Sequence, residues 1–133
     1  MNDRGGRWVR GFETAQAASY HAEVTYEPWK MGAAMFSGNN LLSVGFNLMR
    51  KSHPQSQHIK GYNTCVHAEQ MALIRRRHYD GNSNLIMYVW RTGGDGKAAS
   101  SKPCPNCRNL MRLAGVRKVR YYSEDGEPEE MKL

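Results

Sequence analysis

The chain has 133 residues, 40% of them hydrophobic, which suffices for one folded domain over residues 1–133 but not for two. Its longest apolar run, residues 85–90, is far shorter than the roughly 20 residues of a membrane-spanning helix, which excludes a membrane protein. Lysine and arginine exceed the acidic residues by 19 to 12, and five acidic residues lie in the last ten positions, so residues 1–123 carry a net charge of +11.

The charge and the cysteine content narrow the class of protein further. A positive field attracts polyanions or phosphorylated ligands, although a solvated basic surface has the same composition. Residues 1–7 lack the apolar stretch of a secretory signal and are expected to be frayed or disordered. We therefore expect a cytoplasmic protein, in which Cys65, Cys104 and Cys107 are available for metal binding or catalysis rather than for disulfides.

The first half of the chain predicts a helix, a strand pair and a long loop. Residues 8–24 have apolar side chains at three- and four-residue spacing, as on the buried face of a helix. Residues 31–36 and 41–46 are short apolar runs, and the glycine and asparagines between them favour a tight turn and an antiparallel pair. The polar stretch 50–64 is longer than a minimal connection, and such loops either line functional sites or form mobile surface.

The middle of the chain predicts a second helix and a buried strand. Residues 66–79 show helical periodicity with basic residues in the last turn, and residues 80–82 end the helix. Residues 85–90 are apolar throughout, as in a central strand that is buried on both faces. A glycine-rich loop over residues 92–102 follows and should border any site formed beside this strand.

The last third predicts a helix followed by two strands. Residues 106–114 place apolar side chains on one helical face, and Gly115 is typical of the position after a helix. Residues 116–123 alternate as a strand does. Asp125-Gly126 is a two-residue hairpin signal, so residues 129–133 should return antiparallel to that strand.

Two clusters of metal-binding residue types lie at the starts of two predicted helices. His67 and Glu69 begin the first helix, and Cys104 and Cys107 begin the second, after Pro103. Cysteines three positions apart on a first turn face the same way, and the positive helix end favours the thiolates that zinc prefers. One histidine and two thiolates leave a tetrahedral zinc one ligand short, and an open position for water is typical of a catalytic site.

Such a site needs a base, because two thiolates cancel the formal charge of the metal and weaken its effect on bound water. Glu69 is the predicted base. Two structural alternatives remain open at this point. Cys104 and Cys107 could form a redox pair or half of a zinc knuckle, and Cys65 could join them and His67 in a closed structural site.

Two sequence motifs resemble the signature of the zinc-dependent cytidine and deoxycytidylate deaminase superfamily. These are His67-Ala68-Glu69, which matches H-x-E, and Pro103-Cys104-Pro105-Asn106-Cys107, which matches P-C-x-x-C. The order of predicted elements is similar too, beginning with a strand pair that ends in Gly45-Phe46-Asn47. The resemblance covers residues 31–133 and implies an α/β fold, a three-layer α/β/α sandwich around a mixed sheet with a C-terminal antiparallel hairpin.

The resemblance also implies roles for the four polar residues of the motifs. Zinc would be held by His67, Cys104 and Cys107, and Glu69 would be the catalytic proton shuttle. Glu69 would take a proton from water, pass it to the ring nitrogen and help to protonate the departing amine, so that cytosine becomes uracil.

Substrate contacts are implied at four positions. Asn47 would face the sugar or the base, although an asparagine at a strand end also has a purely structural interpretation. The backbone of Ala68 would face the pyrimidine, and Pro103 would face its edge. Tyr88 or Trp90 of the central strand could line the pocket, and Trp90 is the expected base contact, although buried core is the commoner position of such aromatics.

Six basic residues lie in or beside the segments expected near the site. They are Arg50, Lys51, Arg91, Lys97, Lys102 and Arg108. Together with the charge of residues 1–123 they favour a phosphate-rich strand over a neutral nucleoside. We therefore expect deamination of cytosine in single-stranded nucleic acid, with DNA ahead of RNA.

The alternatives are a free substrate, another base and a function without catalysis. Free dCMP or cytidine is favoured by the short antiparallel tail, which lacks the added helix of the polynucleotide-editing branches that use a histidine ligand. Adenine deamination occurs on the same scaffold. A zinc-stabilised module that only binds nucleic acid would not need Glu69. The oligomeric state stays open, a homo-oligomer included.

Overall fold

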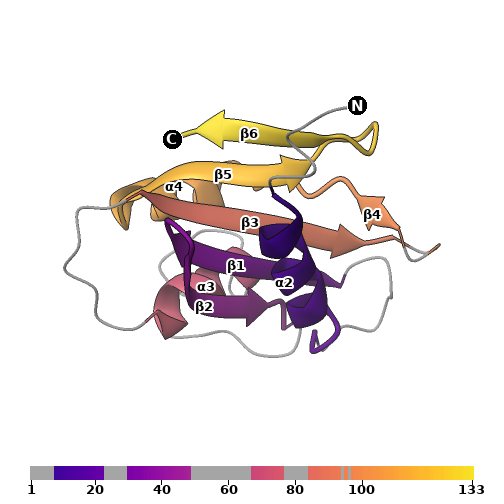
Figure 1. Cartoon of the computed structure of the whole chain (residues 1–133), viewed down its shortest axis with the longest axis horizontal. Coiled ribbons are helices and arrows are strands. Elements are labelled where there is room, and N and C mark those ends of the chain that lie inside the picture. The colour runs from indigo at the N-terminus through magenta and orange to yellow at the C-terminus, as the bar shows by residue number, and fades with distance from the viewer. Residues whose placement is uncertain (1–7, 23–29, 49–66, 77–83, 94, 96) are drawn as a thin grey trace.

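A mixed sheet with the strand order β2-β1-β3-β5-β6 forms the centre of the protein in the computed structural model (Figure 1). The structure describes residues 8–22, 30–48, 67–76, 84–93, 95 and 97–133. The strands are β1 (Met31–Ser37), β2 (Asn40–Phe46), β3 (Leu85–Thr92), β5 (Val116–Tyr122) and β6 (Pro128–Lys132), and the short β4 (Ala98–Ala99) pairs with β3. The described helices are α2 (Val9–Ser19), α3 (Ala68–Arg75) and α4 (Pro105–Leu113).

The pairing directions confirm the predicted mixed sheet. β3 and β5 are parallel, whereas the other described pairs are antiparallel. A parallel pair needs a long crossover, and the segment between β3 and β5 contains α4, which was predicted there. The predicted β1–β2 pair turns at Gly38, whose φ of +57° belongs to the left-handed region that favours glycine.

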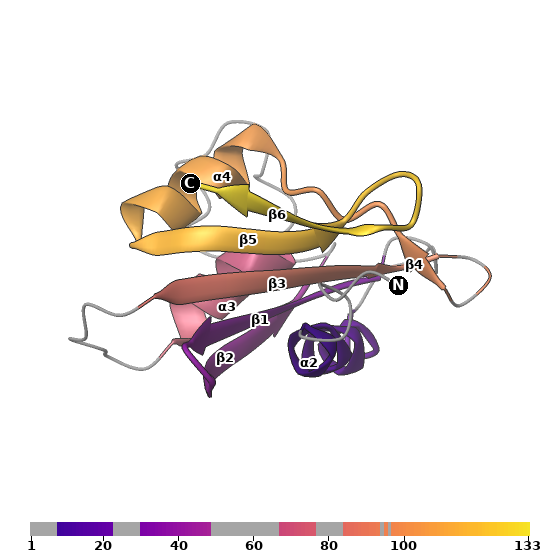
Figure 2. The same cartoon turned by 45° about the horizontal axis from the view of Figure 1, so that its top comes forward.

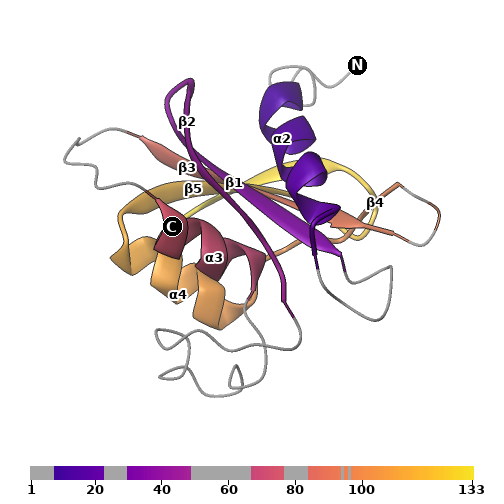
Figure 3. The same ribbon diagram turned by 90° about the horizontal axis from the view of Figure 1, so that it is seen from below.

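Helices cover both faces of the sheet, as the views in Figure 2 and Figure 3 show. α2 lies on one face, and α3 and α4 lie on the other. The side chains of β3 alternate between two buried clusters. Leu85, Met87 and Val89 belong to the cluster with α3 and α4, whereas Ile86, Tyr88 and Trp90 belong to the cluster with α2. This arrangement confirms the three-layer α/β/α sandwich.

The hairpin between β5 and β6 is antiparallel, as predicted, but its loop is longer than the predicted two residues. The N–H of Gly126 donates to the carbonyl of Ser123 at 3.0 Å, and the N–H of Ser123 donates to the carbonyl of Glu127 at 2.9 Å. Residues 124–126 therefore form a three-residue loop. Gly126, with a φ of +79°, occupies the left-handed position that such loops require.

Other element boundaries also differ from the predictions. α2 ends at Ser19 and α3 at Arg75, so both helices are shorter than the predicted 8–24 and 66–79. The predicted glycine-rich loop contains β4, which adds two residues to the edge of β3. The predictions for residues 1–7, 50–64 and Cys65 lie outside the described residues. No described helix combines the length and the apolar character needed to cross a membrane.

The first turns of α3 lie directly on β2 because Gly45 has no side chain. A Cβ atom at Gly45 would lie 2.2 Å from the carbonyl oxygen of Ala68 and 2.5 Å from the backbone nitrogen of Ala72. Two hydrogen bonds hold the helix at this distance. The Ser43 hydroxyl donates to the carbonyl of Ala72 at 2.7 Å, and the N–H of Phe46 donates to the sulfur of Met71 at 3.4 Å.

Replacing Gly45 with alanine should lower the free energy of unfolding by about 1–3 kcal/mol, because the added methyl group forces α3 away from β2. Urea unfolding measures this change. The exposed Leu41 lies on the same strand, and Leu41→Ala should stay within about 0.5 kcal/mol of the wild type. Equal stability of the Gly45→Ala variant and the wild type would contradict this close helix–strand contact.

Candidate metal and catalytic site

His67 lies at the start of α3, where the extended chain turns into the helix. Its backbone φ of −79° and ψ of 153° are those of an N-cap residue. Its N–H donates to the side-chain oxygen of Gln70 at 3.1 Å, which satisfies a backbone donor that has no partner within the helix. The imidazole is thereby held next to the first turn that carries Glu69.

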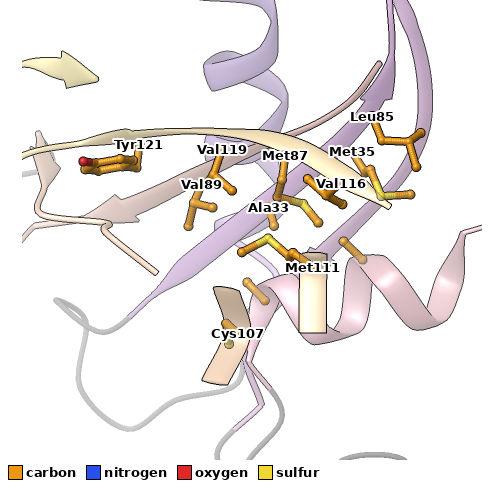
Figure 4. Packing of buried hydrophobic residues seen from close by; sticks show 12 residues of the cluster. Ala33, Met35, Leu85, Met87, Val89, Cys107, Met111, Val116, Val119 and Tyr121 are labelled. Atoms are coloured by element: carbon orange, nitrogen blue, oxygen red, sulfur yellow. The ribbon is translucent and has the colours of Figure 1, made fainter. Parts of the chain in front are cut away.

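Cys104 and Cys107 lie in the same way at the start of α4. Cys104 is the N-cap residue, and its sulfur accepts a hydrogen bond from the N–H of Cys107 at 3.4 Å. Pro105 follows at the first helical position, where its restricted φ suits the helix and its missing N–H costs nothing. Cys107 is fully buried and belongs to the core cluster between the sheet and the two helices (Figure 4).

The segment before Cys104 is attached to the sheet by Ser101, which is 1% exposed. The Ser101 hydroxyl donates to the carbonyl of Val89 on β3 at 2.8 Å and accepts from the N–H of Tyr122 on β5 at 2.8 Å. Its own N–H donates to the carbonyl of Tyr122 at 2.9 Å. These bonds fix the start of α4 relative to both central strands.

The two helix starts bring His67, Cys104 and Cys107 together. One ligand atom from each residue lies within 4.8 Å of the others, and Nδ1 of His67 is 3.5 Å from Sγ of Cys107. Zinc–sulfur and zinc–nitrogen bonds at tetrahedral angles place such ligand atoms about 3.5–3.8 Å apart. The set therefore fits a zinc ion with three protein ligands, and this is the donor set predicted from the sequence.

Glu69 lies in the first turn of α3 and is 2% exposed. Its Oε1 atom has no hydrogen-bond partner among the residues that the structure describes. Burial is the main cause that raises the pKa of the Glu69 carboxyl above its usual range; interaction with His67 acts in the opposite direction. A hydrogen bond with the Cys107 side chain also lowers this pKa, and the Cys104 thiol raises it. The Glu69 carboxyl is therefore close enough to all three residues for their charges or hydrogen bonds to affect its pKa.

Of the predicted substrate contacts, Ala68 and Pro103 adjoin metal-binding residues in the sequence, and Asn47 lies two residues beyond Gly45, which contacts the first turns of α3. Asn47 follows β2 and is buried, and its side-chain oxygen accepts from the N–H of Met31 at 2.9 Å. This bond supports the structural interpretation of Asn47 and also fixes the orientation of its carboxamide. Ala68 is the first residue of α3, and the buried Pro103 directly precedes Cys104.

Trp90 does not fit the predicted contact with the substrate base. It belongs to the cluster of α2, on the face of the sheet opposite to Cys107, and its indole N–H donates to the Thr92 hydroxyl at 2.9 Å. Tyr88 lies on the same face, where its hydroxyl accepts a hydrogen bond from Arg120. Strand alternation sends both aromatics away from the metal ligands, a direction that the uniformly apolar sequence of β3 did not reveal.

Sequence reasoning missed two residues that position the site. Gly45 was noted as part of a motif, and a glycine inside a strand is a known signal of close backbone approach. Ser101 gave no such signal, because a serine in a glycine- and serine-rich loop looks like ordinary loop composition. Only its burial between β3 and β5 shows its role.

Replacing Cys104 or Cys107 with serine should abolish the binding of about one zinc ion per chain and lower the folding stability, because metal binding is coupled to folding. Metal analysis of the purified protein and urea unfolding with and without a chelator measure both effects. Cys65→Ser is the matched control and should keep the metal. An equal loss of zinc in this control would show that Cys65 closes a four-ligand structural site.

Comparisons with known proteins agree with this geometry. The family described as "Cytidine and deoxycytidylate deaminase zinc-binding region" matches residues 9–123. No curated protein sequence shows a significant match.

Solved structures with a similar fold include two cytidine deaminases and a dCMP deaminase. Cytidine deaminase from Burkholderia pseudomallei has a TM-score of 0.68 and 22% identity, over 93% of this chain and 91% of that one. The dCMP deaminase of cyanophage S-TIM5 has a TM-score of 0.61 and 21% identity, over 92% and 86%. Cytidine deaminase from Mycobacterium leprae has a TM-score of 0.60 and 22% identity, over 92% of each chain.

The family match extends over most of the chain and includes both helix starts with their ligand residues. The chain therefore belongs to the zinc-binding cytidine and deoxycytidylate deaminase family and is a zinc-dependent hydrolase.

Proposed function

We propose that this enzyme converts cytosine to uracil in a nucleotide substrate, with His67, Cys104 and Cys107 as zinc ligands and Glu69 as the proton shuttle. The burial of the Glu69 carboxyl beside the three ligand residues carries this proposal. A protein that only binds nucleic acid needs no acid or base beside its metal. A buried carboxyl has a cost in stability, so its presence favours a catalytic role.

The reaction adds water across the C4–N3 bond of the base, with the oxygen on the carbon that bears the amine, and then releases ammonia. A zinc ion held by His67, Cys104 and Cys107 would act as a Lewis acid and make water more nucleophilic near neutral pH. Glu69 accepts a proton from the attacking water while the water oxygen bonds to C4, and it delivers this proton to N3 of the ring. The proton of the new C4 hydroxyl then passes through Glu69 to the exocyclic amine, the bond between C4 and this amine breaks, ammonia leaves and a C4 carbonyl remains.

Asn47, Ala68 and Pro103 are the proposed contacts of the base and sugar. The Asn47 carboxamide is held by Met31 at the end of β2, next to the row of residues covered by α3. The backbone N–H of Ala68 lies in the first turn of α3, where such groups have no partner within the helix and can bind a pyrimidine oxygen. The rigid ring of Pro103 provides a wall beside Cys104.

Within this function we propose single-stranded DNA as the preferred substrate. The charge of +11 over residues 1–123 supports a polyanionic partner. Lys97 and Lys102 are exposed on the segment that connects β3 to α4, and Lys102 directly precedes Pro103. A strand entering the site near this segment would meet both lysines. Arg50 and Lys51, which the sequence also favoured, lie outside the described residues.

Free dCMP or cytidine is the second candidate. The family description names cytidine and deoxycytidylate, both of which are free small molecules. A phosphorylated monomer such as dCMP is attracted by the same positive charge as a strand. Charge by itself therefore separates phosphorylated substrates from neutral nucleosides but does not separate a monomer from a strand.

The variant Glu69→Ala should bind zinc and fold but lose deamination by about 10²- to 10⁴-fold or more, because one residue handles each proton transfer. Product analysis for uracil on dCMP, cytidine and a cytosine-containing oligonucleotide measures this loss. Metal content and urea unfolding of the same sample serve as controls. Near-normal activity in a folded, zinc-containing variant would refute the proposed role of Glu69.

The double variant Lys97→Gln/Lys102→Gln should weaken oligonucleotide binding and flatten its salt dependence, by a log–log slope of about 0.7 for each lost phosphate contact. Titrations at several salt concentrations measure this slope. The matched control is Arg112→Gln/Arg117→Gln, which removes the same charge from exposed positions at the opposite end of α4 from Cys104.

Two results of this titration would favour the free-nucleotide candidate. One is an equal effect of both double variants, which would mean a general surface attraction rather than a strand path at the site. The other is much faster turnover of dCMP than of any oligonucleotide.

A further inference from the structure

Arg91 is the only charged residue in β3, and it shares a face of the sheet with the metal site. The side chains of Leu85, Met87 and Val89 lie in the cluster that contains Cys107 and the start of α3. Because side chains alternate along a strand, Arg91 continues this series and points toward the same face. Its partner in β1, Met31, confirms this direction, because Met31 packs against the same cluster.

The strand register places Arg91 just beyond the start of α3. Val89 pairs with Ala33, which pairs with Gly45, and Gly45 lies against the backbone of Ala68. The helix start therefore covers the row that contains Val89. Arg91 is two residues further along β3, a distance of about 7 Å.

The next row on this face contains Arg91, Met31 and Asn47. Arg91 pairs with Met31 across the two strands, and the Met31 N–H donates to the side-chain oxygen of Asn47 at 2.9 Å. A cationic side chain and a proposed substrate contact thus lie in one row, next to the metal ligands. Such a row suits a nucleotide whose base lies at the metal site and whose negatively charged group lies beside Arg91.

Within the described part of the chain, the guanidinium of Arg91 has no protein partner that explains its position. Its Nε atom is buried and makes no hydrogen bond to any residue that the structure describes, although the residue as a whole is half-buried. The one described salt bridge joins Arg120 to Glu130 and does not involve Arg91. A buried donor without a partner is unfavourable in the free protein, and a bound acceptor would remove this cost.

We propose that Arg91 binds a phosphate group of the substrate nucleotide. This inference rests on the proposed cytosine deamination, because that reaction brings a nucleotide to the row beside Asn47. Arginine remains cationic at physiological pH, and its planar group can offer two parallel N–H donors to phosphate oxygens. Arg91 then distinguishes phosphorylated substrates from nucleosides, which a diffuse surface charge does only weakly.

The test compares substrates that differ only in phosphate. Arg91→Gln should lower kcat/KM for dCMP by about 10- to 100-fold, mainly through KM, because it removes a charge-assisted contact. Deoxycytidine, which has no phosphate, should change by less than about threefold. Arg91→Lys should recover part of the loss for dCMP, because it keeps the charge without the fork of donors.

An oligonucleotide with an internal cytosine and the control Arg117→Gln complete the experiment. Arg117 is exposed at the start of β5, so this variant removes the same charge away from the site. A loss in Arg91→Gln confined to dCMP identifies a terminal phosphate, and a loss confined to the oligonucleotide identifies an internucleotide phosphate. Either loss supports the proposal. Equal losses for deoxycytidine and the phosphorylated substrates, or no loss for any substrate, would overturn it and leave Arg91 a packing role.

A binding measurement separates failure of this inference from failure of the proposed function. Calorimetry on Glu69→Ala compares dCMP with deoxycytidine without turnover, and the same titrations on Glu69→Ala/Arg91→Gln show whether Arg91 provides the difference. If the wild type deaminates no cytosine substrate, the proposed function fails, yet a phosphate preference that depends on Arg91 still supports phosphate binding. Equal affinities for dCMP in the two variants would refute it.

Discussion

The geometry of the metal site depends on how closely the first turns of α3 approach β2. Gly45 permits this approach, because any side chain at that position would collide with the backbone of Ala68 and Ala72. Ser43 then bonds the helix to the strand at 2.7 Å. This contact places His67, Glu69 and the N–H groups of the first turn relative to the sheet. The absence of a side chain at Gly45 therefore determines where the metal site lies.

The start of α4 is positioned by the Ser101 side chain. The Ser101 hydroxyl forms hydrogen bonds with both β3 and β5, and Cys104, three residues later, is the N-cap residue of α4. The parallel β3–β5 pair requires a crossover on the face that α3 already covers, so the two helix starts meet there. The positive end of a helix favours thiolates in general, and the thiolate is the form of cysteine that binds zinc. The crossover between β3 and β5 therefore brings the start of α4, with its two cysteines, to the face of the sheet where His67 lies.

The two faces of the sheet carry different kinds of side chains. The α2 face holds large aromatics, and Phe12 contacts Tyr88 and Tyr122 at centroid distances of 5.4 and 4.7 Å. Arg120 closes this face by stacking over Trp8 at 4.5 Å and bonding Glu130 at 3.0 Å. The opposite face holds smaller and sulfur-containing side chains, the metal ligands and Glu69. Burial of the Glu69 carboxyl in a largely apolar layer raises its pKa above the usual range.

The sequence by itself determined the element types, the mixed α/β fold and the three residues that are positioned to bind a metal ion, because local periodicity and motif spacing encode these features directly. It also indicated the antiparallel C-terminal pair through Asp125-Gly126, although the loop proved to have three residues rather than two. Only the tertiary structure decided which way each β3 side chain points. That direction depends on strand register and on the helix that covers each face, and in a strand that is apolar on both sides the alternation leaves no trace in the sequence. Trp90, the expected base contact, therefore proved to lie in the cluster of α2. The position of Arg91 in the same row as Asn47 became visible only from the strand register.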